Sequence, residues 1–241
     1  MHKVWAKKSD ITTLGMVLQN SLVLLAVVSR RRYPGVNRIC VVTSKARTYY
    51  AIVSRMRKTG LPFTSVLPGA NYSDCALIIT SAKEVRLFGG KAIAMEDFDE
   101  NPSVFKGQLL SKLNGCRDMV LIGVDPGTRI GLAVFYGEAD LEYSTFDSVT
   151  GLSLRVGAFV RGVPAKMFVI RVGNGNPDLA TKLVESLKLE APDTLIEMVD
   201  ESGTSVRRVR LRGIQGDEGA AARIAFRKGE VVNPRSHGIH A

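Results

Sequence analysis

The sequence predicts an α/β protein with two domains, a small N-terminal α/β domain over residues 1–115 and a second α/β domain over residues 116–241. Apolar residues make up 45% of the 241 residues, which is enough to bury a core in each domain. Short apolar runs rich in β-branched residues alternate with helix-type segments, and this alternation is typical of a parallel or mixed sheet. The acidic segment 96–100, followed by Asn101-Pro102, separates two independent strand patterns and predicts the domain boundary nearby.

The charge of the chain is concentrated in its first half. Residues 1–115 hold 17 Lys and Arg against 7 Asp and Glu, whereas residues 116–241 hold 16 of each. Such an excess indicates a polyanionic partner, nucleic acid before a membrane. We therefore interpret the first domain as a docking or oligomerisation domain, with a homodimer as the expected assembly, and we include Arg30, Arg31 and Arg32 among the nucleic-acid contacts.

The most apolar segment, residues 11–28, is interpreted as a buried packing helix or a subunit interface. Lysines precede it and arginines follow it, so a signal peptide or an anchor is the alternative. Gln19, Asn20 and Ser21 interrupt the run, and the apolar part that remains is far too short to span a membrane.

The rest of the first domain reads as one α/β unit. Thr43-Ser44-Lys45-Ala46 lies at a strand end and opens a basic helix, so its amides are candidates to hold a phosphate, although no glycine-rich loop supports this. The predicted strands are 39–42, 62–67, 76–80 and 92–95, and the predicted helices are 45–58 and 104–113.

Cysteine and histidine usage narrows the chemistry. Cys40, Cys75 and Cys116 have no metal-ligand spacing, and we interpret them as reduced, buried thiols of a cytoplasmic protein. The three histidines lie near the termini, which excludes a Ser-His-Asp triad or a His-ligated zinc on a folded core. Any catalysis must then depend on carboxylates, with Mg²⁺ or Mn²⁺ as the expected metal.

The second domain is organised around residues 119–136, which read as two strands joined by a tight turn. Val120–Val124 and Ile130–Phe135 are apolar, and Asp125-Pro126-Gly127-Thr128 between them is typical of a turn. Asp125 therefore lies at the end of a central strand, where a divalent cation would compensate its charge. The alternative is that Asp125 caps the turn by bonding to Thr128.

The remaining elements follow in the order strand, helix, strand, helix, strand, helix. Carboxylates stand at the end of the last strand, Asp200 and Glu201, and at the start of the last helix, Asp217. The tail 229–241 is predicted to be loose. The predicted strands are 140–147, 166–172 and 194–199, and the predicted helices are 149–160, 178–187 and 219–226.

Three motifs in this half resemble a known family. GVDPGTRIGLAVF at 123–135 is similar to the opening strands of the RuvC and YqgF resolvases in the ribonuclease H-like superfamily. VDESGTS at 199–205 resembles the acidic motif on the last strand of YqgF proteins, and DEGAAARIAF at 217–226 resembles their final helix. The motifs occur in the family order and cover about half of the chain, whereas residues 1–115 match neither family.

The resemblance implies a ribonuclease H-like domain with a five-stranded mixed sheet, two metal ions and hydrolysis of a phosphodiester bond. By this resemblance Asp125 would bridge the metals, Glu201 and Asp217 would be further ligands, and Asp200 or Glu197 would be alternatives to Glu201. Two departures weaken it: no arginine follows the acidic pair, and Ala220 stands where RuvC has a second acid. The arginines suited to phosphate contacts near this face are Arg129, Arg207, Arg208, Arg210 and Arg212.

Three functions are therefore compared. The first is a metal-dependent endonuclease acting on nucleic acid, with branched DNA as in a Holliday junction resolvase. The second is a nucleic-acid-binding protein on the same fold that does not cleave, which the missing fourth acid favours. The third is a phosphotransferase of the actin and sugar-kinase type, whose phosphate loop also reads Asp-x-Gly-Thr; residues 1–115 contain no second such loop, which argues against it.

Overall fold

The computed structural model describes residues 38–116, 118–200 and 214–233. The chain divides into two compact units, Met1–Phe105 and Lys106–Ala241, and the division falls within helix α3 (Pro102–Asn114). The sequence places it a few residues later, at the end of that helix. The apolar segment 11–28 lies outside the described residues, and no helix within the described ranges is long and apolar enough to cross a membrane.

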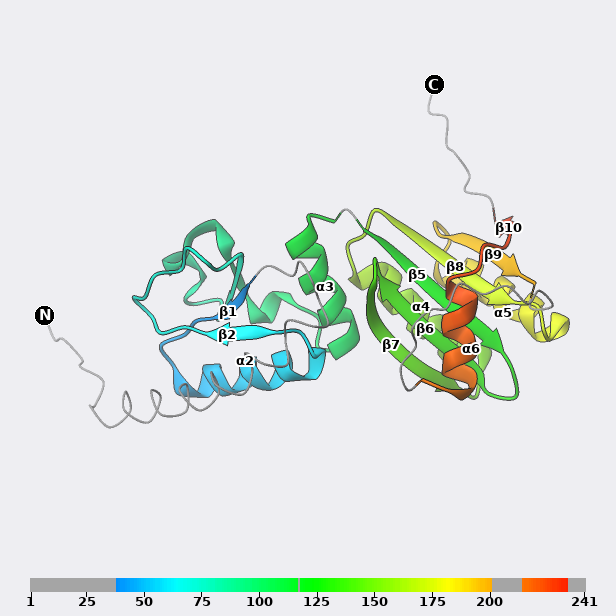
Figure 1. Cartoon of the computed structure of the whole chain (residues 1–241), viewed down its shortest axis with the longest axis horizontal. Helices are drawn as coiled ribbons and strands as arrows, with labels where there is room; N and C mark the ends of the chain where they lie inside the picture. The colour runs from blue at the N-terminus through cyan, green and yellow to red at the C-terminus, as the bar shows by residue number, and fades with distance from the viewer. Residues whose placement is uncertain (1–37, 117, 201–213, 234–241) are drawn as a thin grey trace, which may run out of the picture. The chain divides into compact units, whose positions relative to one another are not determined.

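The first unit contains a four-stranded parallel sheet (Figure 1). All four predicted strands and the helix between the first two are confirmed to within a few residues. Three 3₁₀ turns, η2 (Val85–Leu87), η3 (Gly89–Lys91) and η4 (Met95–Asp97), connect the last strands and α3. The strands, in the order 2-1-3-4, are β1 (Ile39–Val41), β2 (Phe63–Ser65), β3 (Leu77–Thr80) and β4 (Ala92–Ala94).

Helix α2 (Ala46–Thr59) packs on this sheet through one apolar side. Tyr49, Ile52, Val53 and Met56 recur at helical spacing and are all buried. The helix ends at Gly60, whose φ of 67° is the left-handed conformation that glycine adopts without steric cost. The predicted helix over 45–58 is therefore confirmed, and its basic residues Arg57 and Lys58 lie in the last turn, where they interact favourably with the helix dipole.

A disulfide joins Cys40 of β1 to Cys75, two residues before β3, and the Cα atoms are 5.8 Å apart. Both cysteines are buried, in a cluster with Val42 and Ile78. The prediction of three reduced, buried thiols is therefore wrong for this pair, because the parallel pairing of β1 and β3 brings together two cysteines 35 residues apart. It is also wrong for Cys116, which is free but exposed.

Replacing both Cys40 and Cys75 by alanine is expected to lower the free energy of unfolding of the chain by about 2–4 kcal/mol, because the unfolded chain loses the constraint of a long covalent loop. Urea denaturation under non-reducing conditions measures this loss, with Cys116→Ala as the matched control. Equal stabilities of the double variant and the control would contradict the disulfide.

The second unit contains a six-stranded mixed sheet in the order 10-9-8-5-6-7. Strands β5, β6 and β7 form an antiparallel meander, and β8 and β9 run parallel to β5. The predicted element order is confirmed, with β5 in a central position. The strands are β5 (Met119–Pro126), β6 (Ile130–Tyr136), β7 (Ala139–Phe146), β8 (Met167–Gly173), β9 (Leu195–Val199) and β10 (Glu230–Asn233).

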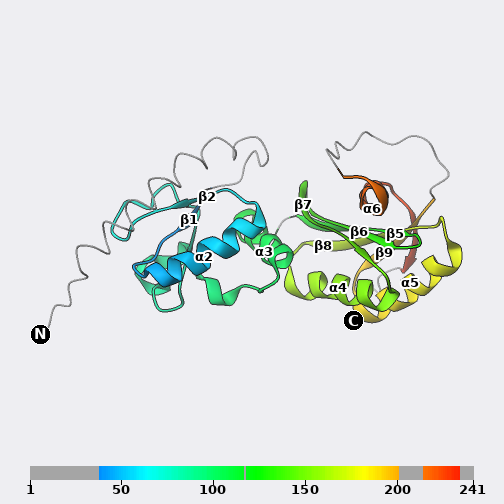
Figure 2. The same cartoon turned by 90° about the horizontal axis from the view of Figure 1, so that it is seen from below.

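Three helices cover the two faces of this sheet. Figure 2 shows α4 (Val149–Gly162) and α5 (Pro177–Glu190) on one face and α6 (Gly216–Ala225) on the other. Helices α4 and α5 begin with side-chain caps, since the Ser148 hydroxyl accepts from the Gly151 amide and the Asn176 side chain accepts from the Leu179 amide.

The prediction of five strands is wrong because β10 adds a sixth. Residues 230–233 pair antiparallel with β9, so the prediction that the tail is loose is wrong for these four residues. Only four residues take part, and their partner lies about thirty residues earlier in the chain, so no local alternation marks them as a strand.

Helix α6 lies unusually close to the sheet because glycines face it. A Cβ atom on Gly123 of β5 would come within 2.0 Å of the Ala221 carbonyl oxygen, and one on Gly131 of β6 within 2.2 Å of the Asp217 carbonyl oxygen. The alanines of α6 then pack directly on the sheet, in a buried cluster with Leu121, Ala133, Phe135 and Val169.

Candidate functional site

The sheet of the first unit contains a topological switch point, the position where open α/β sheets bind their ligands. Its strand order reverses between β1 and β3, because the chain goes from β1 to β2 on one side and from β3 to β4 on the other. Ligands of such sheets bind outside the carboxyl ends of the strands at this switch point. Here these ends carry hydroxyl side chains, Thr43 and Ser44 after β1 and Thr80 and Ser81 at the end of β3.

The carboxylate of Glu84 fills this switch point. It accepts hydrogen bonds from the hydroxyl groups of Thr43 at 2.6 Å, Ser44 at 2.7 Å, Ser81 at 2.8 Å and Thr80 at 3.4 Å. The Ser44 amide donates a further bond at 2.9 Å. Glu84 is 6% exposed, so five donors surround one nearly buried acid. The Ser44 amide, one of those predicted to bind a phosphate, therefore donates its hydrogen bond to Glu84 instead.

These hydrogen bonds decide the charge of Glu84. Burial alone would raise the pKa of its carboxyl, but the bonds from Ser44, Thr43 and Ser81 favour the charged form and lower the pKa to about 2. An acid with so low a pKa is a weak base, because a general base works best with a pKa near the operating pH. The Glu84 carboxylate is therefore the shared acceptor that holds these hydroxyl groups in place.

Glu84→Gln is expected to lower the free energy of unfolding at pH 7 by about 2–3 kcal/mol, since a charge-assisted acceptor is lost. The pKa is depressed in the folded state, so the stabilisation is present above the ordinary pKa of 4.5 and disappears as the pH falls toward about 2. Urea denaturation at several pH values should show the native protein and the variant converging in acid. Glu100→Gln, on an exposed acid of the same unit, should follow the native pH profile.

The second unit places side by side the elements that carry two of the three predicted acids, Asp125 and Asp217. Asp125 on β5 pairs with Gly131 of β6, and Asp217, in the first turn of α6, has its backbone against the same Gly131. Alternation along β5 places Asp125 on the face of Gly123, the face that α6 covers. Glu201, the third predicted ligand, lies outside the described residues.

The alternatives to Glu201 have other contacts. Glu197 of β9 forms an ion pair with Arg171 of β8 at 2.8 Å and accepts the Gly229 amide at 3.2 Å. Asp200 is exposed at the end of β9, and its carbonyl oxygen accepts from Arg227. Across the described ranges, no group of three or more His, Cys, Asp or Glu side chains is placed to hold a metal ion.

The arginines predicted to contact phosphate are mostly beyond the described ranges. Arg129 is described, and it is half exposed and forms an ion pair with Asp147 at 3.3 Å. The others lie in segments 1–37 and 201–213: Arg30, Arg31, Arg32, Arg207, Arg208, Arg210 and Arg212.

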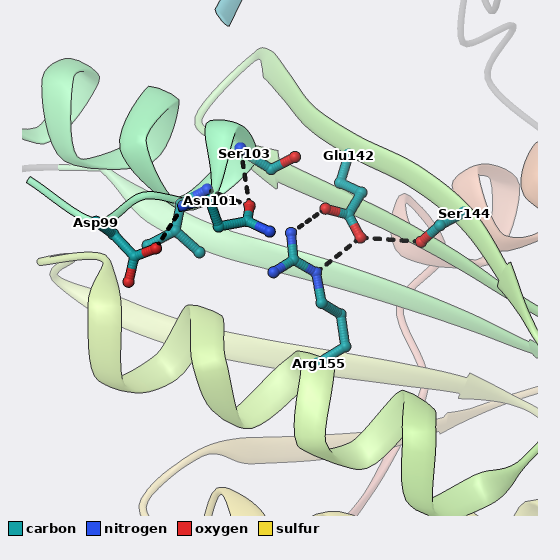
Figure 3. Close-up of polar contacts among 7 residues, drawn as sticks. Asp99, Asn101, Ser103, Glu142, Ser144 and Arg155 are labelled. Atoms are coloured by element: carbon teal, nitrogen blue, oxygen red, sulfur yellow. Dashed lines mark hydrogen bonds and ion pairs between the residues drawn. The ribbon is translucent and has the colours of Figure 1, made fainter. Parts of the chain in front are cut away.

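The most buried ion pair of the α4 face is structural. Figure 3 shows the Glu142 carboxylate between Arg155 of α4 and the Ser144 hydroxyl, whose hydrogen bonds to Glu142 Oε1 are both 2.9 Å long. The Arg155 guanidinium also lies over the Phe159 ring, 4.5 Å from its centre. The same figure shows Asn101 capping α3 by accepting from the Ser103 amide at 3.0 Å. The Arg155–Glu142 pair thus joins α4 to β7, and Asn101 caps the start of α3.

The first unit is thus a parallel α/β module whose switch point is occupied by the Glu84 carboxylate. Residues 38–103 match the family model of the response regulator receiver-like domain. The matched range is less than a third of the chain, and no curated protein matches the chain.

This match corrects the functional interpretation of the sequence. The model that matches is a receiver-like domain, which points to signalling, and it lies in the half for which no resemblance was found. The identification as a RuvC or YqgF resolvase, and with it the endonuclease and the non-cleaving nucleic-acid binder on that fold, is wrong. The motifs misled because a short acid-bearing strand pair and an alanine-rich helix also arise from close packing of a helix on a sheet, as at Gly123 and Gly131.

Sequence reasoning missed Glu84. It gave the amides of the turn at 43–46 as candidate phosphate contacts, with no glycine-rich loop in support, and assigned nothing to the acid 40 residues later. A usable signal is the pair of hydroxyl dipeptides after two neighbouring parallel strands, Thr43-Ser44 and Thr80-Ser81, with one acid shortly after the second.

Proposed function

We propose that the protein acts in signal response, with residues 38–103 as a receiver-like module that works without phosphorylation of a carboxylate. The match to the receiver-like family supports the signalling class. The absence of phosphorylation is inferred from the switch point itself. There the hydroxyl groups at the ends of both strands surround the Glu84 carboxylate and donate hydrogen bonds to it.

A phosphoryl group on a carboxylate requires that acid to be a nucleophile that can reach the donor. Glu84 is nearly buried, and its oxygens already accept five hydrogen bonds. Phosphorylation would break these bonds and bring a doubly charged group into a closed space. A module that signals by binding a partner in this fixed conformation agrees with the structure better than a phosphoreceiver.

The competing function, a phosphoreceiver, is tested directly with a small-molecule phosphodonor such as acetyl phosphate in the presence of Mg²⁺. We expect no phosphoryl mass on the native chain, on Glu84→Gln or on Glu100→Gln, measured by intact-protein mass spectrometry. A hydroxylamine-labile phosphoryl group on the native chain that disappears in Glu84→Gln would establish the phosphoreceiver instead.

The signalling role itself is tested by cross-linking in cells. Glu84→Gln should change the set of proteins cross-linked to the chain, since it loosens the strand ends that display the module's surface, whereas Glu100→Gln should not. Identical sets for the two variants would contradict a regulatory role for this edge.

For the second unit we propose the ribonuclease H-like architecture without its chemistry. The support is the topology alone, a β5–β6–β7 meander extended by parallel β8 and β9, with α4 and α5 on one face and α6 on the other. The α/β class and the mixed sheet are features of the structure itself, and β10 is an addition to the expected five strands.

The Mg²⁺ or Mn²⁺ site at Asp125, Glu201 and Asp217, with Asp200, stays a prediction, as do a nucleic-acid partner, a homodimer and a cytoplasmic location. The site is supported by the backbones of Asp125 and Asp217, which both lie next to Gly131, and such a site would stabilise the folded chain by mass action. Thermal melts of the native chain and Asp125→Asn, each with and without millimolar metal, should show a rise in the native chain alone. No rise in the native chain would contradict the site.

A further inference from the structure

The exposed side of helix α2 carries cations that have no counter-charge. Opposite its buried side the helix presents Arg47, Tyr50, Ser54, Arg57 and Lys58, all exposed, and it contains no Asp or Glu. Within the described ranges, neither Arg47 nor Arg57 takes part in any of the ion pairs. Tyr50 is 55% exposed, and tyrosine and arginine are enriched among the residues that dominate binding at protein interfaces. This side of the helix, the α2 face, is therefore a candidate docking surface.

Arg55, the remaining arginine of α2, fixes an acidic segment beside the helix. Its guanidinium donates to the carbonyl oxygens of Met95 at 3.3 Å and Phe98 at 3.2 Å, and also to that of Asp99. These hydrogen bonds hold residues 95–99 along the C-terminal half of α2. Negative charge is therefore placed next to one end of the α2 face by a cation of the helix itself.

The acids at 96–100 are all exposed, and Asp97 among them is uncompensated. Glu96 and Asp99 each accept a backbone amide, at 3.1 Å and 2.8 Å. Glu100 lines the same small pocket as Lys58, so these two opposite charges lie close together within one copy. The Asp97 carboxylate has no hydrogen-bond or ion-pair partner among the residues that the structure describes. It is thus available to a cation from outside the unit.

The uncompensated cation and the uncompensated anion lie at different ends of the α2 face. Arg47 is eight residues before Arg55, which is about 12 Å along a helix, and the segment that carries Asp97 is bound at Arg55. One end of the face is therefore positive and the other is bordered by a negative charge. Such a surface is complementary to itself when two copies meet with their helices antiparallel.

We propose that the α2 face is the interface of a homodimer, in which the two α2 helices lie antiparallel and Arg47 of each copy pairs with Asp97 of the partner subunit. A two-fold axis repeats every contact, so both ion pairs form at once. Ala51 and Ser54, which are exposed near the middle of the helix, are small and let the two helices approach closely. Tyr50, also near the middle, is covered by the contact.

A second copy fits this face better than a nucleic acid does. Residues 38–105 hold nine Lys and Arg against six Asp and Glu, so the charge excess of this part is small. The exposed acids at 96–100 would repel a continuous polyanion lying along α2, whereas a second copy presents charges of both signs in the matching order. The interface goes beyond the proposed function, because it does not include the switch point, and its failure would leave that function unchanged.

The experiment measures the dimer dissociation constant of the full chain by sedimentation equilibrium at low salt. We expect the native chain to dimerise, and Arg47→Glu and Asp97→Arg each to raise the dissociation constant by about tenfold or more, since each places like charges together twice. An equimolar mixture of the two variants restores opposite charges at both contacts and should dimerise as the native chain does. Arg86→Glu, the same charge change at an exposed arginine outside α2, is the matched control and should not alter dimerisation.

Tyr50→Ala separates the apolar part of the contact from its charges. It should raise the dissociation constant by roughly tenfold and leave its salt dependence unchanged. Circular dichroism establishes that each variant is folded. A monomeric native chain, a dimer that Arg47→Glu does not weaken, or a mixture that does not recover would overturn the proposal. A native chain that binds labelled oligonucleotide or polyglutamate through Arg47 instead of dimerising would also overturn it.

Discussion

Gly123→Ala is expected to lower the free energy of unfolding of the second unit by about 4 kcal/mol, more than a typical substitution. The new Cβ would lie 2.0 Å from the Ala221 carbonyl oxygen and 2.7 Å from the Ala225 amide nitrogen. These are backbone atoms and cannot turn away, so α6 must lift from the sheet. The buried cluster that it covers would then open to water.

Urea denaturation followed by circular dichroism measures this loss. Gly90→Ala is the matched control, because no atom lies within 4 Å of a Cβ at that glycine, and it should change the stability by less than about 0.5 kcal/mol. A Gly123→Ala variant as stable as Gly90→Ala would show that α6 does not lie against β5 as described.

Glu197→Ala should have an effect of about 3–5 kcal/mol, because it leaves the buried guanidinium of Arg171 without its counter-charge. The side chains of Glu197 and Arg171 are 7% and 17% exposed, and Arg171 also donates to the Ala225 carbonyl at 2.7 Å. The pair therefore ties β8 and β9 to the end of α6, and Glu197 further holds the Gly229 amide before β10.

Two further variants serve as controls for Glu197→Ala. Glu190→Ala breaks the more exposed pair with Arg161, 3.5 Å apart, and should cost no more than about 1 kcal/mol. Replacing both members of the buried pair by apolar residues, Arg171→Met with Glu197→Leu, should recover most of the loss, since no uncompensated charge remains. Equal costs for Glu197→Ala and Glu190→Ala would contradict a buried pair.

Most of the fold follows from local patterns in the sequence. Apolar β-branched runs such as Val120–Val124 predict strands wherever both faces are buried, and helical spacing in α2 and α5 predicts their buried sides. What could not be predicted depends on residues far apart in the chain. The pairing of β10 with β9, the Cys40–Cys75 bond and the approach of α6 to Gly123 are of this kind.

The candidate site was harder to predict for the same reason. Asp125 at a strand end and Asp217 at a helix start are predicted from the sequence, and the sheet does bring their elements together at Gly131. Glu84 lies in a loop that opens a 3₁₀ turn, and its role appears only when Thr43, 41 residues away, is placed beside it. A single sequence contains the donors and the acceptor but not their distance.

The separation in sequence between α6 and the strands that it covers has a consequence for biosynthesis. The face of β5, β6 and β8 that carries Leu121, Ala133, Phe135 and Val169 is covered by a helix that the ribosome makes only at residues 216–225. The strands of this face are complete by residue 173, so more than forty residues must be added before their cover exists. At about 5–20 residues per second the nascent chain exposes an apolar surface for seconds, a period in which chaperones would bind it.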